Sequence, residues 1–159
     1  MNRTYLLLGS NMGNSRELLV DAIHQIEKQT GNLICASGLY STAAWGNTDQ
    51  PDFLNQVIVI ETKLSAEQTL QSVLSIEKKM GRVRTVKNAP RIIDIDILFF
   101  NREIIHQADL IVPHPEIQNR RFALIPLNEI DPTFVHPVFG KSVHELLKLC
   151  KDQLNVKKF

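Results

Sequence analysis

Apolar residues recur along this 159-residue chain with two different periods, and the order in which the periods alternate most constrains its fold. Residues 5–8, 33–42, 53–62 and 92–100 are short runs rich in β-branched, aromatic or other large apolar side chains, which is typical of strands. Two intervening segments instead carry apolar residues every three to four positions, as on one face of a helix. The chain therefore alternates between strands and helices within a short length.

Both helical segments have start and stop signals. Asn14 and Ser65 are each followed three residues later by Glu or Gln, a spacing typical of a capping box, and a glycine ends each pattern. The order strand, helix, strand, strand, helix, strand predicts a ferredoxin-like α+β sandwich, a mainly antiparallel sheet with helices packed on one face. Further short helices are expected near residues 122–129 and 142–150.

The length and charge balance of the chain exclude several classes of protein. It carries 18 Lys and Arg against 17 Asp and Glu, a net charge of +1, with 43% hydrophobic residues. This composition predicts one globular domain spanning residues 1–159, and it disfavours disorder and a strongly basic nucleic-acid binder. No apolar run is long enough to span a membrane, so we expect a cytoplasmic protein. Cys35 and Cys150 have no metal-ligand spacing and are interpreted as small buried apolar residues.

A basic run follows the second helical segment. Residues 78–91 contain six cations and no acid. These are Lys78, Lys79, Arg82, Arg84, Lys87 and Arg91. Alone, such a run indicates only a solvated helix end and loop.

Two carboxylates follow the basic run on the last predicted strand. Asp94 and Asp96 alternate with isoleucines, so on a strand they project from one face with Cα atoms about 6.5 Å apart. One interpretation of this carboxylate pair is a half-exposed strand whose polar side faces solvent. The other is a Mg²⁺ site shared with substrate phosphates, since two oxygen ligands at this spacing suit that ion. With arginines beside it, this strand favours phosphoryl-transfer chemistry.

Several short motifs occur together in a recognisable order. They are Gly-Ser-Asn at 9–11, Gln-Pro-Asp-Phe-Leu-Asn at 50–55, Ile-Glu at 76–77, Gly-Arg-Val-Arg at 81–84, Pro-Arg-Ile-Ile-Asp-Ile-Asp-Ile at 90–97, Val-Pro-His-Pro at 112–115 and Asn-Arg-Arg-Phe at 119–122. In this order and spacing the chain resembles the 6-hydroxymethyl-7,8-dihydropterin pyrophosphokinases of folate biosynthesis. The resemblance implies transfer of a pyrophosphoryl group from ATP to the hydroxymethyl oxygen of the pterin, with release of AMP.

The resemblance also implies how ATP and metal bind. Asp94 and Asp96 match the ligands of two Mg²⁺ ions, and Asp96 is also a candidate to orient the hydroxymethyl proton. Arg82 and Arg91 match arginines that act on the phosphates during transfer. The further implied ATP-binding residues are Glu77, Arg84, Ile97, Leu110, His114 and Arg120. For His114, an alternative is that it fixes the proline-rich turn around it.

The implied pterin site draws on two other parts of the chain. Phe53 and Phe122 match the two aromatic residues that sandwich the pterin ring, although without the resemblance both would be assigned to the core. The polar edge of the ring is matched to Asn55 and to backbone groups of Thr42, Ala43 and Trp45. Related sequences commonly have Tyr at position 53, prolines near positions 43 and 44 and, in some, Trp at position 88. These differences affect how the two loops expected to act as lids, at 43–52 and 81–89, would close, and not which reaction they would close over.

Glu77 can be interpreted from its position alone. It lies seven residues after Leu70, so it interrupts the apolar face of the second helix, and a buried carboxylate needs a partner. We expect that partner to be an arginine at 81–84. An alternative function for the whole chain is a ferredoxin-like module that binds RNA or a nucleotide without catalysis. A net charge of +1 supports it only weakly. We therefore expect a monomer that acts on small molecules, with neither nucleic acid nor membrane as partner.

Overall fold

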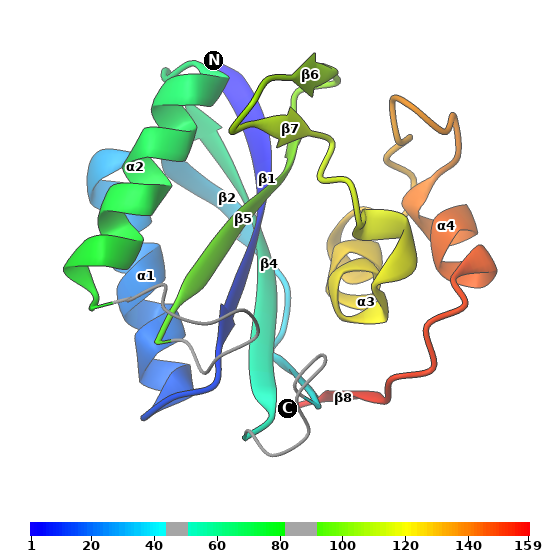
Figure 1. The fold of residues 1–159 in the computed structure, drawn as a ribbon, viewed down its shortest axis with the longest axis horizontal. Helices are drawn as coiled ribbons and strands as arrows, with labels where there is room; N and C mark the ends of the chain where they lie inside the picture. Colours follow the sequence, from blue (N-terminus) through cyan, green and yellow to red (C-terminus); the bar gives the residue numbers. More distant parts are fainter. Residues whose placement is uncertain (44–50, 82–91) are drawn as a thin grey trace.

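A central antiparallel sheet organises the molecule, and the computed structural model describes residues 1–43, 51–81 and 92–159 of it. Its strand order is β5-β1-β4-β3-β8, with β2 also paired to β4 (Figure 1). The strands are β1 (Asn2–Ser10), β2 (Asn32–Ala36), β3 (Tyr40–Thr42), β4 (Phe53–Thr62), β5 (Asp94–Phe100) and β8 (Val156–Lys158). All pairs are antiparallel, so the predicted α+β class with an antiparallel sheet is confirmed.

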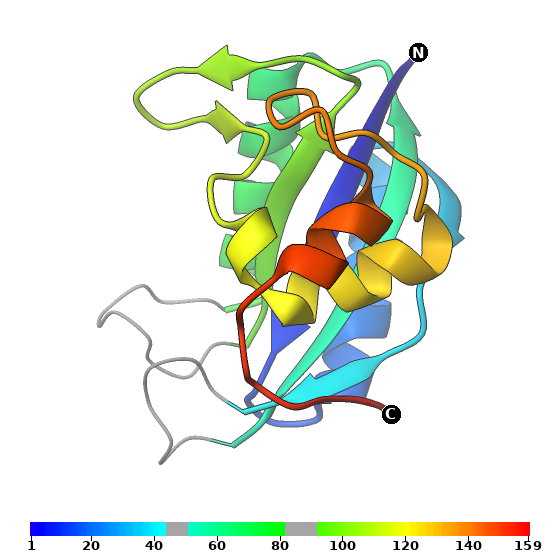
Figure 2. The same ribbon diagram turned by 90° about the vertical axis from the view of Figure 1, so that its right-hand side faces the viewer.

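Helices cover both faces of the sheet rather than one. Helices α1 (Ser15–Gln29) and α2 (Ala66–Lys79) lie on one face, and α3 (Arg121–Ile130) and α4 (Val143–Leu149) lie on the other (Figures 1 and 2). The expectation of a single covered face was wrong because β1 is apolar on both sides. Leu6 and Leu8 enter the core under α1 and α2, whereas Tyr5 and Leu7 enter the core under α3 and α4.

Local capping behaves as the sequence indicates. The Ser65 hydroxyl accepts a hydrogen bond from the Gln68 N–H at 3.1 Å, and Gln68 Oε1 accepts from the Ser65 N–H at 2.9 Å, which completes a capping box. Asn14 Oδ1 accepts from the Glu17 N–H at 3.3 Å. Ser142 and Glu145 form another capping box at the start of α4.

The predicted strand over residues 33–42 is divided into β2 and β3. Ser37 and Gly38 lie between them. The Ser37 N–H still donates to the Val57 carbonyl at 2.8 Å, but other polar groups of the two residues make contacts outside the strand ladder. Ser37 Oγ accepts from the Val57 N–H at 3.0 Å, and the Gly38 N–H donates to Glu129 Oε2 at 3.0 Å. These side-chain contacts redirect the chain and place Tyr40 opposite Asn55 on β4.

The segment between β5 and α3 contains a small hairpin, β6 (Ile105–His106) with β7 (Ile111–Val112), and a 3₁₀ turn, η1 (Ile117–Asn119). Cys35 and Cys150 are free, and they are half-buried against the α3/α4 core rather than fully buried. Among the described residues, no helix has the length and apolar character needed to cross a membrane.

Candidate active site

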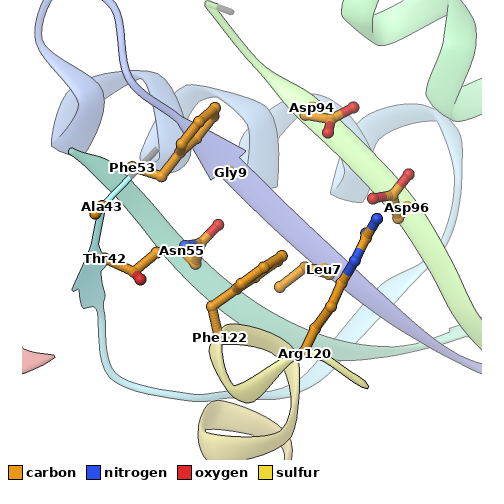
Figure 3. Close-up of a pocket in the computed structure, with 10 residues that line it drawn as sticks. All are labelled: Leu7, Gly9, Thr42, Ala43, Phe53, Asn55, Asp94, Asp96, Arg120 and Phe122. Atoms are coloured by element: carbon orange, nitrogen blue, oxygen red, sulfur yellow. The ribbon is translucent and has the colours of Figure 1, made fainter. Parts of the chain in front are cut away.

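A pocket of about 110 Å³ lies on the sheet face that α3 covers, beyond the helix's first turn (Figure 3). Strands β1, β3, β4 and β5 and the start of α3 contribute its walls. Its lining residues are Leu7, Gly9, Thr42, Ala43, Phe53, Asn55, Asp94, Asp96, Arg120 and Phe122. Most were predicted from the sequence as substrate-binding residues. Leu7 and Gly9 are additions, and the Gly-Ser-Asn motif at 9–11 was the one signal for Gly9.

The register of the sheet explains why the pocket forms at this end. Side chains of β4, β1 and β5 that share the α3 face form three successive cross-strand rows. The rows are Val59, Tyr5 and Phe99, then Val57, Leu7 and Asp96, then Asn55, Gly9 and Asp94. The face is apolar beneath α3 and α4 and becomes polar where the pocket opens.

Gly9 is required by its neighbour in the last row. A Cβ atom at position 9 would lie 2.7 Å from Asn55 Oδ1, closer than real contacts allow. The absence of a side chain therefore lets the Asn55 amide lie across β1 at the base of the pocket.

Two polar groups at this base have no protein partner among the described residues. Asn55 Nδ2 and Thr42 Oγ1 are buried, and neither finds a hydrogen bond there. An unsatisfied buried polar group costs about 1–3 kcal/mol, so such groups usually mark a place where a ligand or water binds. Figure 3 shows the rings of Phe53 and Phe122 on either side of the Asn55 amide.

Phe53 and Phe122 are half-buried, and both line the pocket. Phe122 also packs partly against the α3/α4 core. The Arg120 guanidinium lies 5.6 Å from the centroid of the Phe122 ring. Figure 3 shows Arg120 extending along the pocket toward Asp96.

Asp94 and Asp96 share one face of β5, as the alternation predicted. Both are half-exposed and line the pocket, while Ile95 and Ile97 are buried in the core under α1 and α2. The described residues contain no cluster of three or more His, Cys, Asp or Glu side chains suited to a metal. A cation here would take two carboxylates from the protein and its remaining ligands from water or substrate.

Glu77 has a partner that sequence reasoning missed. It is 2% exposed, and its Oε2 accepts a hydrogen bond from the Ile95 N–H at 2.7 Å, between the two aspartates. The arginines at 82 and 84 that were expected to pair with it lie outside the described residues. Because the Ile95 N–H points away from β1, the main-chain groups of Ile97, two residues on, point to the same outer edge of the sheet.

His114 is held next to this edge by a β-bulge. The register between β1 and β5 shifts by one residue at Leu98, and the Leu98 carbonyl accepts from the His114 N–H at 3.0 Å. His114 Nδ1 accepts from the Glu116 N–H at 3.1 Å, so the histidine does fix its turn. Burial and then the charge of Arg120 lower the pKa of His114 to about 4, against the raising effects of Glu116 and Asp94. The ring is therefore neutral at pH 7, with its proton on Nε2.

The structure does not bring every predicted residue to the pocket. The Leu110 side chain is buried in the core, and its main chain closes the turn with Gln107. Trp45, Arg82, Arg84 and Arg91 lie outside the described residues, as do most of the two expected lid loops.

Known proteins match most of the chain. Residues 5–132 match the family model for 7,8-dihydro-6-hydroxymethylpterin-pyrophosphokinase. A 2-amino-4-hydroxy-6-hydroxymethyldihydropteridine pyrophosphokinase of Methylorubrum extorquens is 39% identical over 148 residues, which cover 92% of each chain. The enzyme of that name from Aquifex aeolicus is 38% identical over 145 residues, 91% of this chain and 90% of the relative.

Longer relatives contain a matching region as well. The folic acid synthesis protein fol1 of Pneumocystis carinii is 41% identical over 87% of this chain, but the match spans only 19% of fol1. A crystal structure of wild-type Plasmodium falciparum HPPK-DHPS with STZ-DHP is similar in fold, with a TM-score of 0.78 at 20% identity. That match covers 93% of this chain and 43% of the other. The family model and the two relatives matched over nine-tenths of their length show that this chain belongs to the 7,8-dihydro-6-hydroxymethylpterin-pyrophosphokinase family and acts as a pyrophosphokinase in folate biosynthesis.

Proposed function

We propose that the pocket binds 6-hydroxymethyl-7,8-dihydropterin and presents its hydroxymethyl oxygen to ATP. The observation that carries this proposal is the pair of buried polar groups, Asn55 Nδ2 and Thr42 Oγ1, at the base of a slot between two phenyl rings. A pterin is a flat heterocycle with donors and acceptors along one edge. Its ring would stack between Phe53 and Phe122 while its edge satisfies the buried groups. Backbone groups of Ala43 and Trp45 are the remaining candidates for contact with that edge.

Asp94 and Asp96 are the residues that would hold Mg²⁺. Their carboxylates are hard oxygen ligands, they share one side of β5, and they are accessible from the pocket. Mg²⁺ in phosphate-transfer sites commonly takes one or two carboxylates and completes its shell with water and phosphate oxygens, which matches this donor set. Two bound ions would supply neutralisation of the ATP phosphate charge.

The remaining ATP contacts come from the outer edge of β5 and from arginines. The proposed hydrogen-bond partners of the nucleotide are the main-chain groups of Ile97 and the Nε2–H of His114, whose main chain is bonded to Leu98 of β5. Glu77 supports the edge by holding the Ile95 N–H. The guanidinium groups proposed to bind phosphate oxygens are those of Arg82, Arg84, Arg91 and Arg120. Among them, Arg82 and Arg91 are assigned to the charge that develops during transfer.

The proposed reaction is a direct in-line displacement. The hydroxymethyl oxygen forms a bond to the β-phosphorus of ATP, and the bond from that phosphorus to the oxygen bridging to the α-phosphate breaks, so that AMP leaves. The hydroxyl proton is lost in this step, and Asp96 is the candidate to orient or accept it. The chain's own contribution is to position both substrates and to balance charge.

The function is tested by measuring AMP release and pterin binding together. Wild-type protein should release AMP from ATP only when both the pterin and Mg²⁺ are present. Asn55→Ala should weaken pterin binding by about 1–2 kcal/mol in calorimetry, because it removes the buried donor. Asn32→Ala, on the exposed side of β2, is the matched control and should bind normally. AMP release that does not depend on the pterin, or normal binding by Asn55→Ala, would contradict the assignment.

A further inference from the structure

The C-terminal end of α3 carries two carboxylates where helix electrostatics do not favour them. Glu129 lies in the last turn and Asp131 is the C-cap residue. The C-terminus of a helix carries partial negative charge, so acidic side chains there repel it. Both carboxylates instead accept a hydrogen bond from a tyrosine hydroxyl of the sheet, from Tyr40 and Tyr5 respectively.

Glu129 is the more extensively bonded of the two. Its Oε1 accepts from the Tyr40 hydroxyl and lies 3.6 Å from the Lys158 ammonium, and its Oε2 accepts from the Gly38 N–H at 3.0 Å. Burial alone would raise the pKa of Glu129, but these hydrogen bonds and the Lys158 charge lower it. Burial and the Glu129 contact raise the pKa of Tyr40 to about 12, so the donor remains protonated. One side chain thus joins α3 to β3, to β8 and to the bend between β2 and β3.

The two tyrosines differ in where their strands lie relative to the pocket. Tyr40 is paired with Asn55, and two residues later Thr42 is paired with Phe53, so β3 passes directly along the pocket base. Tyr5 lies in the row with Val59 and Phe99, the row farthest from the pocket of the three. β1 lines the pocket as well, through Leu7 and Gly9, but only the Tyr40 contact joins α3 to the cross-strand row that contains Asn55.

The first turn of α3 supplies the opposite wall. Phe122 lines the pocket from the same helix that carries Glu129 in its last turn, and the helix is short and continuous between them. The separation between the Phe122 ring and the Thr42 and Asn55 groups therefore depends on how α3 is held against β3, in addition to its packing on the sheet core.

We propose that Tyr40 and Glu129 are positioning residues for the pyrophosphokinase reaction. Their hydrogen bond fixes α3 against β3 and so sets the width of the slot between Phe122 and the polar base of the pocket. This inference rests on the proposed assignment of that slot to the pterin. Tyr5 and Asp131 make a chemically equivalent contact that stabilises the helix without setting the slot.

The test compares two matched variants, Tyr40→Phe and Tyr5→Phe. Each removes one hydroxyl that bonds to a carboxylate at the end of α3, so both should lower the melting temperature. Tyr40→Phe should raise the pterin Kd and KM by about two- to tenfold, the range for loss of one net hydrogen bond, while kcat at saturating substrate stays within about twofold. Tyr5→Phe should leave the pterin Kd unchanged, and the ATP Kd should be unchanged in both variants.

Glu129→Gln and Glu129→Ala provide an independent measurement. Gln keeps the size of the side chain and one acceptor oxygen for Tyr40, so its pterin Kd should lie between those of wild type and Glu129→Ala. The proposal is overturned if neither tyrosine variant changes the pterin Kd, or if both change it equally, since either result makes the contacts merely structural. Failure of Asn55→Ala to weaken pterin binding would instead overturn the assignment of the pocket.

Discussion

The two faces of the central sheet are built from the same strands but differ in whether their polar side chains have hydrogen-bond partners. The α1/α2 face packs aliphatic side chains such as Leu8, Ile58 and Ile95, and a polar residue among them is satisfied, since Gln56 Nε2 donates to the Ser37 carbonyl at 2.8 Å. On the α3 face, the row that contains Asn55 keeps a buried donor without a partner among the described residues. Alternate residues of one strand thus fill the core on one side and, in the proposed function, recognise the ligand on the other.

This division has an energetic reason. Groups held ready for a ligand destabilise the unliganded protein, because their desolvation is not repaid within the chain. Burial of large apolar side chains on the opposite face offsets that cost. Variants on the two faces should therefore separate folding stability from substrate binding and turnover. Three predictions test this and a fourth concerns pH, from the largest expected effect to the smallest.

Leu8→Ala tests the α1/α2 face. Leu8 is fully buried, and its chain neighbours Leu7 and Gly9 line the pocket on the other side. The variant should lose about 2–5 kcal/mol of unfolding free energy in urea titrations, through lost burial and a cavity. Its pterin Kd, measured where the protein is still folded, should match that of wild type. A large loss of pterin affinity would show that the two faces are not independent.

Asp94→Ala and Asp96→Ala test the polar end of the other face. Each should lower kcat by about 10²–10³-fold, equivalent to about 2.7–4 kcal/mol, because each removes a ligand for the charge-neutralising cation. Unfolding free energy should stay level or rise, since two neighbouring carboxylates repel one another. Asp21→Ala, an exposed position on α1, is the control and should keep full turnover. Near-normal turnover of either pocket variant at saturating Mg²⁺ would contradict the metal assignment.

Phe122→Ala tests the slot itself. Loss of a ring that stacks on a heterocycle should weaken pterin binding by about 1–3 kcal/mol and leave ATP affinity almost unchanged in calorimetry. Phe139→Ala removes an equivalent ring that is 46% exposed, and it should bind both ligands normally. Equal loss of both ligands by Phe122→Ala would indicate collapse of the packing under α3 and not loss of a stacking contact.

The stability of the unliganded protein should fall as the pH is lowered from about 7 to about 5. Burial lowers the pKa of His136, and it lowers that of His114 from 6.5 to about 4 with help from Arg120. The unfolded chain therefore takes up these protons first, and the unfolding free energy falls through this window, for His114 by about 1–2 kcal/mol. Urea titrations at a series of pH values would measure the slope.

Asparagine variants locate the source of that slope. His114→Asn and His136→Asn each keep an acceptor near the Nδ1 position, which in the wild type accepts backbone N–H groups two or three residues on. Each should flatten the pH dependence of the unfolding free energy. An unchanged slope in both buried variants would mean that carboxylates control this pH range.

Features that depend on local sequence were predicted well. The capping box of Ser65 and Gln68 marks where α2 begins, since all its residues lie within one turn. The alternation around Asp94 and Asp96 determines which side chains of β5 share a face. The alternation was enough to predict that the two carboxylates act together. The two phenylalanines were assigned to the site by resemblance alone, because half-buried rings and core rings have the same sequence pattern.

Features that depend on distant pairing could not be predicted. Nothing in the 33–42 segment indicates that Ser37 and Gly38 bond to β4 and α3, and so it was interpreted as one strand. The Ile95 N–H that donates to Glu77 was not foreseen, because it is available only through the edge position of β5. The expected arginine partner of Glu77 stays a prediction. The cross-strand row that gathers Asn55, Gly9 and Asp94 likewise exists only once the register is set.

The bulge at Leu98 gives β5 a change of parity along its length. Before it, even-numbered residues such as Asp94 and Asp96 face the pocket, but after it Leu98 and Phe99 both enter the α3/α4 core and Phe100 turns to the α1/α2 side. Because of this one inserted residue, β5 presents carboxylates at one end and the Phe99 ring at the other end, both on the α3 face of the sheet. A one-residue deletion before the bulge would move the aspartates to the α1/α2 face and the isoleucines to the pocket face. We therefore expect β5 to tolerate substitutions far better than insertions or deletions.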